Sequence, residues 1–126
     1  MKRILLFSVI ILSAFNIYAS AKWTLIANTA NGVFFIDASS IQKSGDSYTF
    51  WQKTNFDKRR DNGDLSSKVQ RTFNCRTRES IYRYMMFYDD IDNNGNLTGS
   101  FKPNGDWNPI PPESTSWRFY EYVCNR

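Results

Sequence analysis

The side chains that usually carry enzyme chemistry are scarce in this 126-residue sequence. It contains no His, and its two Cys are Cys75 and Cys124. It has no glycine-rich phosphate loop and no G-x-S-x-G nucleophile motif. The acidic residues Asp89, Asp90 and Asp92 crowd into one turn, whereas an acid and a base that act together must be set across a cleft. We therefore expect a protein that is not an enzyme and that uses no cofactor.

One short motif has the chemistry of a cation site. Residues 90–95 read D-I-D-N-N-G, which matches the start of a calcium-binding loop, with oxygen ligands at alternate positions and a glycine at the bend. The twelfth position is Phe101 where such loops place a bidentate Glu, and strands rather than helices flank the motif. Asp, Asn and Gly are also the residues that tight turns need. We expect a β-turn here and no metal.

Basic side chains could bind an anionic partner, such as a sulfated glycan or an acidic protein segment. The candidates are Lys58, Arg59, Arg60, Arg76 and Arg78, with Arg83 as a further member. Asp57, Asp61 and Asp64 interleave with the first three candidates and weaken the local field. The alternative is that these charges only keep the domain soluble.

The N-terminus predicts export. Residues 1–21 have the order of a secretory signal peptide, with Lys2-Arg3 first, then an apolar segment, then a small-x-small cleavage site at residues 19–21. The apolar segment is shorter than the ~20 residues that span a bilayer, and no Cys near the cleavage point could carry a lipid anchor. Lys2 and Arg3 account for two of the 16 Lys and Arg, so 14 remain against 12 Asp and Glu. That small excess does not predict a nucleic-acid partner.

Residues 22–126 have the length of one domain, and no linker or repeat divides them. In an exported chain, two Cys are more readily a disulfide than a metal or redox pair. We therefore expect Cys75 to pair with Cys124, the alternative being two free buried thiols.

Alternating hydrophobic residues separated by turn residues predict a mainly antiparallel β domain of the α+β class. Its longest strand pair surrounds Cys75, and Trp51 is assigned to the core. A helix is expected over residues 114–124, with Ser114 or Ser116 as N-cap, and the disulfide would tether this helix to a single sheet of five or six strands. Strands are expected at residues 23–27, 33–36, 47–54, 68–77, 80–89 and 96–101.

Short motifs in a fixed order resemble the bacterial surface-adhesin protein E family. They are Trp23, Phe34-Phe35-Ile36-Asp37 with Ser40-Ile41, Trp51-Gln52-Lys53, Phe73-Asn74-Cys75, Tyr88-Asp89 with Gly95, Trp107 with Ile110-Pro111, and Tyr122-Val123-Cys124. The resemblance implies an exported domain with an antiparallel sheet and a disulfide-tied C-terminal helix. It also implies binding of host extracellular-matrix or serum proteins.

Export, the lack of catalytic groups and this resemblance together predict a non-catalytic binding protein. We expect it in the periplasm, at the cell surface or secreted, as a monomer or homodimer with a protein partner. One alternative is a periplasmic domain that binds or inhibits an envelope or host enzyme. Another is a structural component of the envelope.

Overall fold

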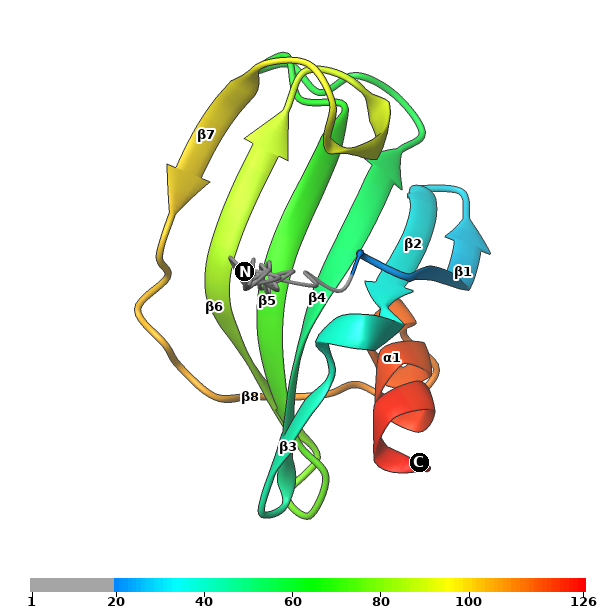
Figure 1. Ribbon diagram of the computed structural model, residues 1–126, viewed down its shortest axis with the longest axis vertical. Helices are drawn as coiled ribbons and strands as arrows, with labels where there is room; N and C mark the ends of the chain where they lie inside the picture. Colours follow the sequence, from blue (N-terminus) through cyan, green and yellow to red (C-terminus); the bar gives the residue numbers. More distant parts are fainter. Residues whose placement is uncertain (1–19) are drawn as a thin grey trace, which may run out of the picture.

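The computed structural model describes residues 20–126, which form one antiparallel sheet and one helix (Figure 1). Residues 1–19, which hold most of the predicted signal peptide, lie outside the described residues. The strands are β1 (Trp23–Thr29), β2 (Gly32–Asp37), β3 (Gln42–Ser44), β4 (Ser47–Phe56), β5 (Ser66–Asn74), β6 (Glu79–Tyr88), β7 (Leu97–Phe101) and β8 (Asn108–Pro109). The helix α1 spans Thr115–Cys124, and two short 3-10 turns are η1 (Ala38–Ser40) and η2 (Ile91–Asn93).

The sheet has eight strands, not five or six. Its continuous order is β1-β2-β4-β5-β6-β7, and these six strands correspond to the six expected from sequence. The two additional strands are β3, which pairs with β4, and β8, which pairs with β6. They have three and two residues, too few for an alternating hydrophobic pattern to reveal.

Near the centre of the sheet, β5 lies between β4 and β6. Nine residue pairs connect β5 with β6, from Ser66 opposite Tyr88 to Asn74 opposite Glu79. The Asn74 side-chain oxygen accepts N–H bonds from the next turn residues, and Arg78 completes the turn with a left-handed φ of 57°. A β-bulge shifts the register at Gln70/Arg71. Because of the bulge, Tyr82 lies on the helix side of the sheet with Met85 and Phe87, whereas Tyr84 lies on the other face, and strict alternation does not predict this separation.

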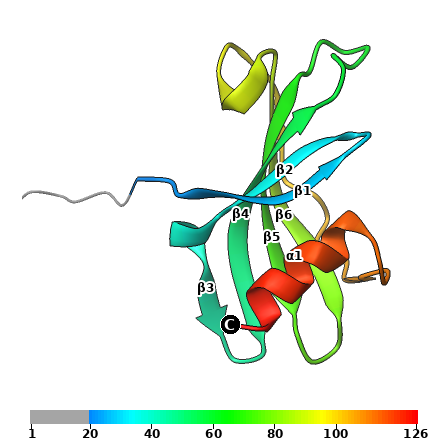
Figure 2. The same ribbon diagram turned by 90° about the vertical axis from the view of Figure 1, so that its right-hand side faces the viewer.

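The core lies between one face of the sheet and α1, which covers that face alone (Figure 2). Phe50 is at its centre, with its ring edge-on to Phe73 at 4.9 Å and stacked on Phe119 of α1 at 5.8 Å. The assignment of Trp51 to this core is wrong. Side chains alternate along β4, so Trp51 lies on the other face of the sheet, where its ring stacks with Tyr84 at 6.5 Å.

The expected disulfide and helix are confirmed. Cys75, just after β5, is bonded to Cys124, the last residue of α1, with their Cα atoms 5.7 Å apart. Ser114 is the N-cap, and its hydroxyl accepts the Trp117 N–H at 3.1 Å. Tyr120 adds a second link by donating from its hydroxyl to the Cys75 carbonyl at 3.0 Å. No helix in residues 20–126 is long and apolar enough to cross a membrane.

Candidate functional site

The acidic turn at residues 89–95 uses its carboxylates to hold the turn together. The Asp92 carboxylate accepts one hydrogen bond from the Asn55 side chain at 2.8 Å and pairs with Lys53 at 3.2 Å, and these contacts hold the pKa of Asp92 below its usual value. Asp89 accepts the Asn96 N–H at 2.7 Å, and this bond lowers the pKa of Asp89. No group of three or more His, Cys, Asp or Glu in the described part of the chain is arranged to hold a metal ion. What the turn does is fix the end of β6 to β4.

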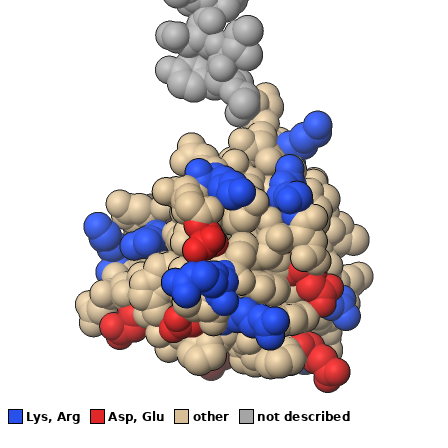
Figure 3. All heavy atoms as spheres, turned by 90° about the horizontal axis from the view of Figure 1, so that it is seen from below, with Lys and Arg blue, Asp and Glu red and all other residues tan. Residues whose placement is uncertain are grey.

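The predicted basic residues do not form one surface. Lys58, Arg59 and Arg60 lie in the loop between β4 and β5, whereas Arg76 and Arg78 lie in the turn between β5 and β6. These connections are at opposite ends of β5, whose nine residues span ~30 Å. Figure 3, which looks onto the end that carries the β5–β6 turn, shows Lys and Arg side chains beside Asp and Glu.

Local contacts occupy most of these cations. Arg59 donates to the carbonyls of Gly63, at 3.0 Å, and of Asp89, at 2.6 Å, so it fastens its own loop. Arg76 pairs with the exposed Asp46 at 3.1 Å, and the Arg78 guanidinium lies 5.9 Å from the Trp117 ring. A binding role for these residues stays a prediction.

Arg60 is the member of the set that lines a hollow. Its guanidinium lies 4.0 Å from the Phe56 ring, at the rim of a depression of about 210 Å³ on the helix side of the sheet. No residue of α1 lines this depression, whose lining includes Phe34, Tyr82, Met85 and Phe87. The hollow offers mainly apolar contacts.

A buried cation lies beside this hollow. Arg71 is 3% exposed, and its guanidinium lies 4.7 Å from the Phe73 ring and 4.5 Å from the Tyr82 ring. It donates to Gln52 at 3.1 Å and to Ser116 of α1 at 3.0 Å, and burial lowers its pKa. Arg71 therefore connects the helix to the sheet, and its hydrogen-bonding partners are neutral.

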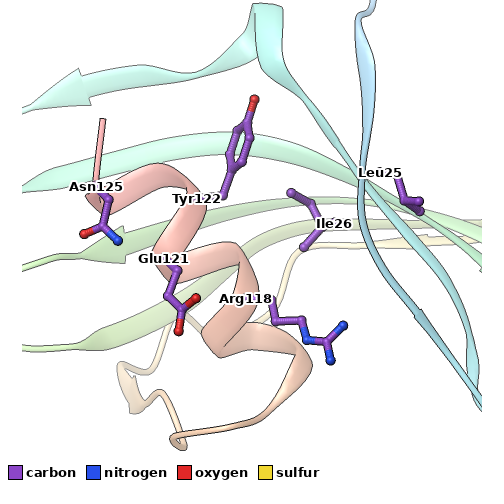
Figure 4. Close-up of a pocket in the computed structure, with 6 residues that line it drawn as sticks. All are labelled: Leu25, Ile26, Arg118, Glu121, Tyr122 and Asn125. Atoms are coloured by element: carbon purple, nitrogen blue, oxygen red, sulfur yellow. The ribbon is translucent and has the colours of Figure 1, made fainter.

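A larger groove of about 500 Å³ lies between β1 and α1 (Figure 4). Its lining residues are Leu25, Ile26, Arg118, Glu121, Tyr122 and Asn125. Figure 4 shows Ile26 directed toward the helix, with Arg118 and Glu121 on neighbouring turns of α1. Leu25 lies on the other side of β1 and is 59% exposed. The groove thus has an apolar strand wall and a helix wall with both charge signs.

The backbone of β1 also offers hydrogen bonds. Among the described strands β1 pairs with β2 alone, so its other edge is free. Along an antiparallel edge strand, residues whose backbone groups bond to the neighbouring strand alternate with residues whose backbone groups face outward. The Ala38 N–H donates to the Lys22 carbonyl at 2.9 Å, so Lys22 is one of the residues bonded to the neighbouring segment. Thr24 then bonds toward β2, whereas the N–H and C=O of Leu25 face the free edge. An extended peptide could add to this edge and place side chains in the adjacent groove.

Sequence reasoning missed the groove. Alternation in residues 23–27 predicts a strand but does not say whether that strand is at the edge of the sheet. The bulge at Leu25/Ala27, which brings Ile26 to the helix side, leaves no pattern in so short a segment. The amphipathic pattern of residues 114–124 was the available signal, because Arg118 and Glu121 lie outside its apolar face.

The comparisons with known proteins agree with this fold. The family model for surface-adhesin protein E matches residues 23–125. No curated protein sequence matches the chain. Haemophilus influenzae protein E in crystal form II is similar in structure, with a TM-score of 0.64 and 17% identity over 82% of this chain and 87% of that chain. A second structure of Haemophilus influenzae protein E has a TM-score of 0.63 and 17% identity over 82% of this chain and 83% of that chain. The match over nearly all of residues 22–126 shows that this chain belongs to the surface-adhesin protein E family.

Proposed function

We propose that the protein is a non-catalytic adhesin that binds a host matrix or serum protein by adding an extended segment of that partner to the free edge of β1. Family membership supports a surface adhesin at an exported or cell-surface location. The observation that carries the proposal is the combination of a free strand edge with a groove beside it. Backbone bonds at the edge would provide affinity, and the groove would select side chains.

The two walls of the groove suggest what the partner segment contains. Ile26 and Tyr122 favour an apolar side chain pointing into the groove. Arg118 and Glu121 favour flanking polar side chains of either sign. A segment of alternating apolar and charged residues would meet both requirements.

A substitution at Leu25 separates the backbone contribution from the side chain. Leu25→Pro removes the outward N–H and leaves the bonds of β1 to β2 in place, because proline is tolerated on edge strands. Leu25→Ala, the matched control, shortens the side chain and keeps the N–H. Both proteins would be tested in solid-phase binding to a panel of purified matrix and serum proteins.

We expect the wild-type protein to bind at least one member of the panel, and Leu25→Pro to weaken binding about tenfold more than Leu25→Ala, roughly one or two lost hydrogen bonds. Melting curves would verify that both variants are folded. Equal binding by the two variants would refute the strand-addition mode. Absence of binding to any panel member, together with recovery only from the periplasm, would instead favour a periplasmic binding or structural role.

A further inference from the structure

Within residues 20–126, the face of the sheet opposite α1 is covered by no α-helix and no second sheet. The short turn η1 lies against its β4 side, and this face is turned toward the viewer in Figure 1. We call it the open face. Its central positions are Trp51 on β4, Lys68 and Gln70 on β5, and Tyr84 on β6. These strands have paired neighbours on both sides, so their backbone groups are already hydrogen-bonded within the sheet. A ligand on the open face would meet side chains only.

Three cations on the open face are positioned by aromatic rings. The Lys68 ammonium lies 5.0 Å from the Trp51 ring, and the Lys102 ammonium lies 5.5 Å from the Tyr84 ring. The bulge in the β5–β6 pairing leaves Arg83 without a direct partner on β5. Arg83 donates to the Thr72 hydroxyl at 3.2 Å, and its guanidinium lies 6.0 Å from the Trp107 ring. Contact with a ring restricts each side chain before a ligand arrives, which lowers the entropic cost of binding.

The carboxylates near these cations have other partners. Asp37 accepts bonds from the Lys22 N–H at 2.8 Å and the Ser39 N–H at 3.0 Å. Asp92 pairs with Lys53 at 3.2 Å. Within residues 20–126, no carboxylate lies at ion-pair distance from Lys68, Lys102 or Arg83. The open face therefore carries positive charge that no ion pair within the described residues neutralises, although the charge of Lys68 helps to lower the pKa of the Asp37 carboxylate.

One cross-strand contact on the open face is unfavourable without an anion. Lys53 on β4 is directly opposite Lys68 on β5, and like charges in this position destabilise a sheet. Asp92 offsets the charge of Lys53 in an ion pair, whereas Lys68 contacts the Trp51 ring and interacts with the Asp37 carboxylate without forming an ion pair. An anion beside Lys68 would relieve this repulsion.

From these observations we infer that the open face binds a sulfated polysaccharide. Lys68, Arg83 and Lys102 lie on β5, on β6 and directly after β7, so they span three neighbouring strands, or ~10 Å. A linear polyanion can contact cations spread in this way, and sulfate oxygens accept the N–H bonds that Lys and Arg donate. An acidic peptide would bind less well, because the centre of the sheet offers it no free backbone groups. The exposed Tyr84 ring adds an amphipathic contact surface for the chain of sugar rings.

The experiment compares two double substitutions that remove the same charge. Lys68→Gln with Lys102→Gln alters the open face, whereas Lys58→Gln with Arg76→Gln alters two cations at the ends of the strands. Both would be prepared as residues 22–126, and binding to immobilised heparin would be measured at several salt concentrations. Unsulfated hyaluronan and polyglutamate would serve as comparison ligands at equal chain length.

We expect the open-face variant to bind heparin at least tenfold more weakly and to show a shallower salt dependence, because fewer counterions are released. The matched variant should change affinity less than threefold, and hyaluronan and polyglutamate should bind the wild-type protein more weakly than heparin does. Equal losses in the two variants, or preferred binding of polyglutamate, would overturn the inference. Leu25→Pro should retain heparin binding, which separates this result from the test of the β1 edge.

Discussion

The Cys75–Cys124 disulfide should contribute a large part of the stability of this domain. The two residues are 49 positions apart, and closing a loop of that length lowers the entropy of the unfolded chain enough to stabilise the fold by about 4 kcal/mol. Replacing both residues, Cys75→Ala with Cys124→Ala, removes the cross-link and leaves no buried thiol. We therefore expect the free energy of unfolding to fall by about 4 kcal/mol.

The same variant should keep α1 in place on the sheet. Phe119 and Val123 are fully buried in the core, and they hold the helix without help from the sulfur atoms. The loss then arises mainly in the unfolded state, because the cross-link no longer restricts that chain. The folded variant should accordingly give a circular dichroism spectrum close to that of the wild-type protein.

Urea unfolding and hydrogen exchange measure the two parts of this prediction separately. Urea titration should give the lower free energy of unfolding, with an m-value at least as large as in the wild-type protein because the unfolded chain is less compact. The amide groups of α1 should still exchange only with global unfolding. A loss below about 1 kcal/mol would contradict the entropic origin, and rapid exchange confined to α1 would show that the disulfide, rather than Phe119 and Val123, holds the helix.

Three further perturbations test the packing, one turn and the pH dependence. Phe119→Ala should lower the free energy of unfolding by about 3–5 kcal/mol in urea titration, because the ring is fully buried; a loss below ~1 kcal/mol would contradict its central place in the core. Gly32→Ala should lower the free energy of unfolding by about 3 kcal/mol, because the added methyl group would collide with a carbonyl of β4. At Gly45 an added methyl group meets nothing within 4 Å, so the control Gly45→Ala should lower the free energy of unfolding by about 1 kcal/mol. Equal losses in the two variants would contradict the close contact between Gly32 and β4. Burial by itself raises the pKa of Asp37, but hydrogen bonds from Ser39 and a backbone amide outweigh it and hold the pKa below its usual value. The contribution of Asp37 to the stability of the fold is therefore complete above its unfolded-state pKa of about 4, and it is lost as the pH falls through the lower folded-state pKa. Asp37→Asn should accordingly reduce the loss of melting temperature between about pH 4 and lower pH, measured by thermal unfolding at several pH values. An unchanged slope of melting temperature against pH would refute this role of Asp37.

The sequence by itself determined the main elements of this domain for reasons that are local. Alternation between two faces marks the six longer strands, and the hydroxyl of Ser114 marks the start of the helix. Two Cys in an exported chain leave one intramolecular pairing. Each of these signals depends on neighbouring residues or on the number of Cys in the chain, so no knowledge of long-range contacts is needed.

Only the tertiary structure decided which surfaces are available to a partner. Alternation places Phe50 and Trp51 on opposite faces of β4, but the position of α1 determines that Phe50 is in the core and Trp51 on the open face. Successive turns of an antiparallel sheet lie at opposite ends, which separates Arg60 from Arg76 although both occur near β5 in the sequence. The free edge of β1 likewise results from the order of strands across the sheet. These features arise from contacts between residues that are distant along the chain, and a pattern within any one segment does not encode them.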